Sequence, residues 1–411
     1  MYLYKLYNRN LGYIKNKLNY DKGEYMDNKS IIKILFLNFL TMATFNIAHP
    51  VTPTLINVLG LPTYTFGLFY SSMAIAQFVM SPIWGSISDA KGRKKILIVG
   101  MIGYGISQLG FGFSSNESMI LLFRVLAGGL SVGYITVSTA YISDVSTKED
   151  RIKYLSYNTA ANSIGASFGA LVGGFVGMSG YKYAFFTQFL ASILIALLVA
   201  IFIKETITEK NDKYKVYLGH LKLNKSLIDL KSSIGVMMIV MVLITIATTA
   251  YSSTINYFLE DVANVPTSVN GIVMAVAGII ALFMNVVINP YLSKYFEEVK
   301  TMVVALGITG VSIILFSFIN NNYIAFLFLA IFIASSAIVT PIQQSIVSKL
   351  AKDNYGEVMG IQGSFKALGM VSGSLISGFI FDYGNKLPFI IGGISSLIAF
   401  FIASKIKINN K

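Results

Sequence analysis

The chain has 411 residues, of which 55% are hydrophobic and 12% are charged. A soluble protein is charged at about a quarter of its residues, so this composition excludes an ordinary soluble enzyme. The formal net charge is +13, but the cations fall in loops and tails, where they orient a membrane protein, and they do not indicate a nucleic-acid partner. Cysteine is absent, which excludes disulfides, thiol catalysis and cysteine metal sites.

Residues 1–30 form a polar tail that is expected on the cytoplasmic side. Its tyrosines and lysines are compatible with a segment that lies on the membrane surface. A second interpretation is that translation begins at Met26, because codons for Lys22-Gly23-Glu24 can contain a ribosome-binding sequence. Residues 1–25 would then be absent from the protein, and N-terminal sequencing would distinguish the two interpretations.

Twelve apolar runs follow the tail, each near the twenty residues that a helix needs to cross a bilayer. They are expected at 33–57, 64–86, 96–115, 118–143, 157–179, 183–203, 233–257, 268–290, 301–319, 323–347, 357–381 and 388–405. The longest polar insert separates the sixth run from the seventh. The expected parts are an N-terminal half at 31–203, a cytoplasmic linker with some amphipathic helix at 204–232, a C-terminal half at 233–405 and a cytoplasmic tail at 406–411.

The distribution of lysine and arginine predicts the orientation of these runs. Lys182 and Lys386 are the two cations expected on the outer face, whereas Arg124 and Lys366 fall inside apolar runs. The other cations share one face, which the positive-inside rule assigns to the cytoplasm. Both termini are therefore expected in the cytoplasm. The excess of lysine over arginine is typical of an AT-rich bacterial genome, which predicts a bacterial inner membrane.

An internal repeat relates the two halves of the chain. A shift of 204 residues pairs Gly165 with Gly369, Gly169 with Gly373, Gly174 with Gly378, Gly180 with Gly384, Lys182 with Lys386 and Phe185 with Phe389. A constant offset without gaps indicates two related six-helix units. Parallel repeats of this kind are arranged about an axis along the membrane normal.

The most distinctive motif lies between the second and third runs, from Gly85 to Lys95. Four cations in five positions cannot lie in hydrocarbon, so the motif predicts a tight cytoplasmic loop with turns at its glycines. The pattern resembles the loop signature of the major facilitator superfamily. The matching residues are Gly85, Asp89, Gly92, Arg93 and Lys94, and Ala90 stands where the family usually has a cation.

This resemblance implies an all-α membrane protein with twelve transmembrane helices in two pseudo-symmetric six-helix halves. It also implies alternating access around a cavity near the membrane midplane. In similar transporters the loop that contains Asp89 locks the cytoplasmic side of the two halves. Arg93 and Asp144 are the expected partners of Asp89 here.

Three residues are candidates for proton transfer or gating. Arg124 resembles the Arg-x-x-x-Gly motif of the fourth helix in the same superfamily, although snorkelling of its side chain to the outer surface is an alternative. Asp144 follows Tyr141 in a pattern similar to drug/proton antiporters, tetracycline exporters among them; a solvated loop carboxylate is the alternative. A histidine such as His49 could titrate in the physiological range and gate a proton, but a polar residue at the membrane interface is the more common interpretation.

The fifth run contains a glycine face at Gly165, Gly169, Gly173 and Gly174. Glycines one turn apart let a neighbouring helix pack closely, which is the simpler interpretation of this pattern. The run also resembles the antiporter signature of drug exporters. Ser156 and Ala170 stand where that signature has a glycine and a proline, so less bending of this helix is expected.

Lys366 lies about nine residues into the eleventh run and is expected to line the central cavity, with snorkelling toward the cytoplasm as the alternative. The other cavity candidates are polar or aromatic residues within the runs. They are Asn46, Gln77, Tyr134, Asn162, Asn256 and Gln343. No Asp or Glu falls near the middle of any run, so proton coupling is implied by the resemblance and not by a buried carboxylate.

The sequence therefore predicts a secondary active transporter that exports hydrophobic drugs or other small organic compounds in exchange for protons. Its partners would be a small-molecule substrate, protons and the bilayer, with no cofactor beyond the proton gradient, no metal and a monomeric state. The first alternative is a transporter of a specific metabolite, an anion because of Lys366. The second is a non-transporting receptor on the same frame, which the intact loop from Gly85 to Lys94 disfavours.

Overall fold

The computed structural model describes residues 28–147, 150–207, 232–319, 322–351 and 355–405, and these parts of the chain contain helices and no strands. Ten helices are long and apolar enough to cross a bilayer. Two shorter helices, α2 (Asn28–Asn46) and α15 (Leu387–Ala403), complete a set of twelve. The expected start at Met26 and the amphipathic helix of the linker lie outside the described residues.

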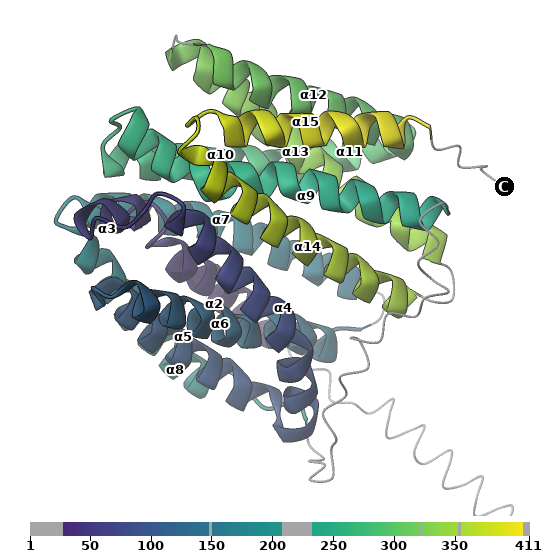
Figure 1. Cartoon of the computed structure of the whole chain (residues 1–411). Coiled ribbons are helices and arrows are strands. Elements are labelled where there is room, and N and C mark those ends of the chain that lie inside the picture. The colour runs from purple at the N-terminus through teal and green to yellow at the C-terminus, as the bar shows by residue number, and fades with distance from the viewer. Residues whose placement is uncertain (1–27, 148–149, 208–231, 320–321, 352–354, 406–411) are drawn as a thin grey trace, which may run out of the picture.

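The helices form two bundles, drawn in purple to teal and in green to yellow in Figure 1. The N-terminal half contains α2, α3 (Thr52–Val58), α4 (Thr65–Lys91), α5 (Arg93–Phe113), α6 (Glu117–Val145), α7 (Arg151–Gly177) and α8 (Tyr181–Phe202). The C-terminal half contains α9 (Ser233–Tyr257), the π-helical turn η3 (Phe258–Val262), α10 (Thr267–Phe283), the π-helical turn η4 (Met284–Ile288), α11 (Asn289–Tyr295), α12 (Glu298–Phe318), α13 (Asn322–Ala351), α14 (Tyr355–Phe381) and α15.

The first expected run is wrong as a single helix. The helix α2 ends at Asn46, a stretch of turns follows, and α3 begins at Thr52. Pro50 and Pro53 explain the break, because proline lacks a backbone donor and disfavours a helical residue before it. Pro53 is placed in the first turn of α3, where a missing N–H costs nothing.

The loop expected from Gly85 to Lys95 is also shorter than predicted. The helix α4 continues through Asp89 to Lys91, so Gly85 lies inside a helix. Gly92 alone makes the turn into α5, with a φ angle of 103° that favours glycine. Asp89 and Arg93 are consequently four residues apart across this turn, close enough for their side chains to meet.

Each half has its own hydrophobic core. The N-terminal core contains three tyrosines with no exposed surface, Tyr104, Tyr134 and Tyr141. The C-terminal core is built from methionine and branched aliphatic residues of α9, α12, α13 and α15. A third cluster joins the halves through Phe66 and Phe69 of α4, Tyr257 of α9 and Phe381 of α14. Separate cores allow each half to move as a unit against the other.

Glycines bring helices of opposite halves close together. A Cβ atom on Gly174 of α7 would lie 2.9 Å from the Cα atom of Gly271 in α10. A Cβ atom on Gly67 of α4 would lie 2.9 Å from the Cα atom of Gly378 in α14. These two crossings lie toward the end of the molecule that holds α3, which we call the closed end. Small residues permit this backbone approach, and larger ones would push the halves apart.

Candidate functional site

Three cavities lie between the two halves. The gate cavity, of about 30 Å³, lies beneath Phe66 and Tyr257 and is lined by residues of α3, α4, α6 and α9. The arginine cavity, of about 140 Å³, is lined by His49, residues of α4 and α6, and Met370 of α14. The aromatic cavity, of about 530 Å³, is lined mainly by α9, α10 and α13. Cavities of several hundred Å³ suit small organic ligands.

These cavities adjoin one another through shared lining residues, and we call them the cavity series. His49, Tyr70 and Arg124 line both the gate cavity and the arginine cavity. Ser252 of α9 lines both the gate cavity and the aromatic cavity. A ligand in this region would therefore contact both halves of the protein at once.

Arg124 is the central charged group of the series. Its residue is only 6% exposed, and its guanidinium lies 4.5 Å from the centroid of the Phe111 ring. Its Nε atom is buried and donates to no acceptor among the described residues. The side chain therefore does not snorkel to the surface. A buried cation without an ion pair is costly in a membrane protein and marks a candidate functional position.

His49 lies beside Arg124, which the sequence could not show. Its imidazole packs edge-on against the ring of Tyr70, with 6.4 Å between the ring centroids. The turn between α2 and α3 carries this histidine into the interior, because the proline-rich segment ends the first helix early. Two proton or gating candidates from different helices thus share one cavity.

Lys366 lies on the side of α14 that faces the N-terminal half. Its side chain is exposed. One helical turn further along α14 are Gly369, which packs on Thr245 of α9, and Met370, which lines the arginine cavity. Residues three and four apart share one helix face, so Lys366 borders the space between α9 and α4. Lys366 is not among the residues that line the three cavities, so its expected place in the central cavity stays a prediction.

The polar cavity candidates separate into two groups. Gln77 lines the arginine cavity and Asn256 lines the gate cavity. Tyr134 and Gln343 do not line any cavity, because both have no exposed surface and lie inside single halves. Gln343 donates to the carbonyl oxygen of Met237 at 3.0 Å and accepts from Gln362 at 2.6 Å. Tyr134 and Gln343 are therefore corrected from cavity residues to core residues.

Asn46 and Asn162 are also absent from the linings of the three cavities. Asn46 donates to the carbonyl oxygen of Met42 at 2.8 Å, within its own helix. The Oδ1 atom of Asn162 is buried and accepts no hydrogen bond among the described residues.

Small hydroxyl residues of the aromatic cavity are functional candidates that the sequence reasoning missed. They come from α7, α9 and α13, and they are Thr159, Thr248, Ser252, Ser336 and Thr340. Thr248 and Ser252 are one turn apart, and so are Ser336 and Thr340. Hydroxyls repeated at this spacing inside an apolar run were the available signal.

The glycine face of α7 serves two different contacts. Gly165, Gly169 and Gly173 abut the backbone of α2, because a Cβ atom at each would meet the carbonyl oxygens of Phe39, Ala43 and Ile47, respectively. Gly174 instead faces α10 of the other half. Helix packing therefore explains all four glycines, three within one half and one between halves.

Hydrogen bonds between the halves lie at the closed end. Asn57 of α3 donates to Asp261 of η3 at 3.2 Å and accepts from the Tyr257 hydroxyl at 3.2 Å. Thr54 donates to Glu260 in the same region. The rings of Phe66 and Tyr257 stack with centroids 5.4 Å apart. These contacts join the two halves at this end of the cavity series, and we call them the gate contacts.

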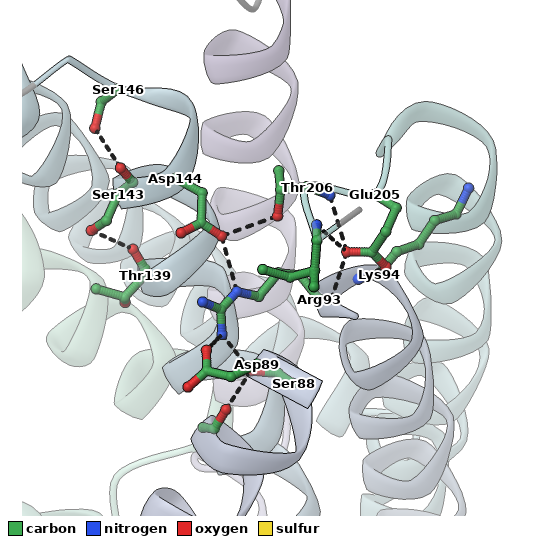
Figure 2. Close-up of polar contacts among 12 residues, drawn as sticks. Ser88, Asp89, Arg93, Lys94, Thr139, Ser143, Asp144, Ser146, Glu205 and Thr206 are labelled. Carbon is green, nitrogen blue, oxygen red and sulfur yellow. Dashed lines mark hydrogen bonds and ion pairs between the residues drawn. The ribbon is translucent and has the colours of Figure 1, made fainter. Parts of the chain in front are cut away.

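Figure 2 shows a charged network at the opposite end of the N-terminal half. Arg93 contacts the carboxylates of Asp89 at 2.5 Å and Asp144 at 3.0 Å, and donates to the Ser88 hydroxyl at 2.6 Å. Asp144 also accepts from Thr206 at 3.0 Å. The expected partnership of Asp89, Arg93 and Asp144 is thus present, and all its members belong to one half.

Glu205 caps the helix α5 from a distant part of the chain (Figure 2). Its carboxylate accepts the backbone N–H of Arg93 at 2.8 Å and that of Lys94 at 3.2 Å. An anion at a helix N-terminus satisfies free N–H groups and complements the helix dipole. The sequence gives no local sign of this cap, because residue 205 follows the sixth run.

We expect Glu205→Ala to lower the free energy of unfolding by about 1 kcal/mol, the usual effect of losing a helix cap. The thermal midpoint of the purified protein in detergent would fall. Lys204→Ala is the matched control, because Lys204 is the exposed neighbour in the sequence. Equal midpoints for the two variants would contradict the capping role.

The comparisons with known proteins agree with this architecture. A family model described as Major Facilitator Superfamily matches residues 34–299 and 237–408. Multidrug resistance protein 2 of Bacillus subtilis is 27% identical over 384 residues, covering 92% of this chain and 95% of that protein. Quinolone resistance protein NorA of Staphylococcus aureus is 26% identical over 365 residues, covering 88% and 92%, respectively.

Solved transporters have the same fold. The inward-facing, unoccupied structure of a bacterial homologue of the human lysosomal transporter Spinster has a TM-score of 0.75 at 14% identity, covering 93% of this chain and 98% of that chain. The xylose transporter XylE from E. coli, in a partially occluded inward-open conformation, has a TM-score of 0.70 at 17% identity, covering 92% and 97%. With a family model that spans both of its halves, the chain belongs to the Major Facilitator Superfamily.

Proposed function

We propose that the protein is a secondary active transporter that exports hydrophobic organic compounds in exchange for protons. The observation that supports this most strongly is the series of adjoining cavities between two separately packed halves, whose hydrogen bonds to each other, among the described residues, lie at one end. The names of the two relatives, a multidrug resistance protein and a quinolone resistance protein, support export of drugs.

The positive-inside rule assigns the closed end to the outer face of the membrane, with both termini in the cytoplasm of a bacterial cell. The conformation is then inward-facing, and export requires the gate at Asn57 and Asp261 to open. Arg93, Asp89 and Asp144 lie in one half, so they leave the cytoplasmic side free in this state. Rocking of one half against the other would alternate the access of the cavities.

The energy source that we propose is the proton gradient, without a cofactor. No Asp or Glu lines any of the three cavities, so the coupling proton would be handled by another group. His49 lines two cavities with Arg124, and an imidazole can accept and release a proton, which makes it the first candidate. Asp144 is the candidate at the cytoplasmic end. Each half has its own core, so a monomer suffices for this mechanism.

Accumulation of the fluorescent quinolone norfloxacin tests this function. Bacteria that lack their own drug pumps would be compared with and without the protein, before and after a protonophore. We expect lower accumulation with the protein and loss of that difference once the proton gradient collapses. If the strains with and without the protein accumulate norfloxacin to the same level, and tetracycline likewise, drug export is contradicted and the transport of a specific metabolite is favoured.

A further inference from the structure

The charge of the cavity series indicates a class of substrate. We propose that the transported compounds carry an anionic group, a carboxylate or sulfonate, on an aromatic body. This inference rests on the proposed transport function and adds the chemistry that the site recognises. It follows from three features: an unpaired buried arginine, a lysine on the facing helix, and a neighbouring cavity without charge.

Arg124 provides the first contact for an anion. Its guanidinium has one face on the Phe111 ring, and its Nε donor is buried without an acceptor among the described residues. The planar fork of an arginine matches the two oxygens of a carboxylate. A substrate carboxylate in the arginine cavity would supply the acceptor that the protein does not, and would neutralise a costly charge.

Lys366 provides a second cation at the border of the same space, one helical turn from its lining. It lies one turn from Met370, which lines the arginine cavity together with Arg124. Four residues of a helix span about 6 Å along its axis, within the reach of a lysine side chain. No ion pair involves Lys366 in the described part of the chain. Two cations would thus converge on one anion from opposite halves.

No acidic side chain lines the three cavities, and several acidic side chains outside them contact other groups. Asp89 and Asp144 pair with Arg93, and Glu205 caps α5. Glu260 and Asp261 accept hydrogen bonds from α3 in the closed gate. A lipophilic cation in the cavities would meet the positive charge of Arg124 and no lining carboxylate. Like charges in a medium of low dielectric repel strongly, so the site would reject such a cation.

The aromatic cavity would hold the rest of the substrate. Its lining combines hydroxyl and amide groups with Phe332 and Tyr251, whose ring centroids are 5.0 Å apart, and it contains no charged side chain. Ser252 connects it to the gate cavity, which Arg124 also lines. An aromatic body would stack on these rings while its anionic group lies between Arg124 and Lys366.

Two fluorescent tricyclic compounds of matched shape test the proposal. Anthracene-9-carboxylate is an anion, and N-methylacridinium is a permanent cation. Binding of each to the purified full chain in detergent would be measured for the wild type, Lys366→Gln, Lys366→Arg and Lys366→Glu. Lys182→Gln is the matched control, since Lys182 is in the first turn of the helix α8 and lies over the ring of Phe113, with no cavity-lining residue one turn away.

We expect the wild type to bind the anthracene anion at least about tenfold more tightly than the acridinium, because a charged hydrogen bond commonly contributes this much. Lys366→Gln would lose about tenfold for the anion, and Lys366→Arg would retain the affinity. Lys366→Glu would favour the cation, and Lys182→Gln would change neither affinity. Preferential binding of the acridinium by the wild type, or unchanged anion binding by Lys366→Gln, would overturn the proposal.

Transport in proteoliposomes separates this inference from the proposed function. Movement of N-methylacridinium without movement of the anthracene anion would leave a drug transporter with a different specificity, and would overturn the inference alone. If neither tricyclic compound nor norfloxacin moves under a proton gradient, the proposed function itself fails. Gradient-driven movement of the anthracene anion and not of the acridinium supports both.

Discussion

Replacement of Gly174 by valine is expected to abolish transport while both halves remain folded. A Cβ atom at this position would lie 2.9 Å from the Cα atom of Gly271 and 2.9 Å from the carbonyl oxygen of Thr267, both in the other half. These are backbone atoms of a helix, so they cannot move aside as a flexible side chain can. The added bulk would keep the closed end apart and hold the protein outward-open.

Cysteine labelling measures this change directly, because the chain contains no cysteine. A single Ser252→Cys reporter lies in the gate and aromatic cavities. With Gly174→Val, a membrane-impermeant maleimide added outside the cell would label this cysteine much faster than in the parent. Gly363→Val is the control, because no atom lies within 4 Å of a Cβ there. Unchanged labelling would contradict closure of the halves at this glycine.

The same substitution five residues earlier has a different expected effect. Gly169 abuts the backbone of Ala43 within the N-terminal half. Gly169→Val would therefore disrupt the packing of α7 on α2 and reduce the amount of folded protein, instead of trapping one conformation. The contrast between these two glycines distinguishes a crossing between halves from a crossing inside one half.

Arg124→Gln is expected to reduce transport by about ten- to a hundredfold without loss of stability. The charged guanidinium is the central cation of the cavity series, and interactions with a charged group commonly contribute about 1.5–3 kcal/mol each. The buried Nε atom has no acceptor among the described residues, so removal of this charge also relieves a cost in the folded protein. Arg124→Lys would restore little of the lost transport, because the lysine ammonium lacks the planar donor pair of a guanidinium.

Arg93→Gln is the matched comparison for stability. Arg93 is 8% exposed and holds the carboxylates of Asp89 and Asp144 together. Its loss would leave these two carboxylates facing each other, so the thermal midpoint should fall below that of Arg124→Gln. Transport by Arg124→Gln at the wild-type rate would contradict the placement of the arginine in the site.

Much of the fold could be predicted because the bilayer imposes simple rules on the chain. The lengths of the runs, the position of the cations and the 204-residue repeat together specify two six-helix halves. The errors occurred where local chemistry overrides hydropathy. Pro50 ends a helix inside an apolar run, and the helix α4 carries Asp89 beyond the hydrocarbon before Gly92 turns the chain.

The site was harder to predict, because a polar residue in an apolar run can face a cavity or a packed core. Gln77 and Gln343 look alike in the sequence, yet one lines the arginine cavity and the other bonds within the C-terminal half. Helices of this fold are surrounded by protein on several sides, so periodicity does not identify the cavity face. The meeting of His49 with Arg124 depends on the broken first helix, which hydropathy did not reveal.

Norfloxacin transport by the purified protein in proteoliposomes, under an imposed pH gradient, is the most direct test of proton-driven export. We predict that the quinolone moves against its own concentration gradient while protons cross the membrane in the opposite direction to the quinolone. A protonophore and the Gly174→Val substitution would each stop this movement. Quinolone movement that is independent of the pH gradient, or that persists in Gly174→Val, would contradict proton-coupled alternating access.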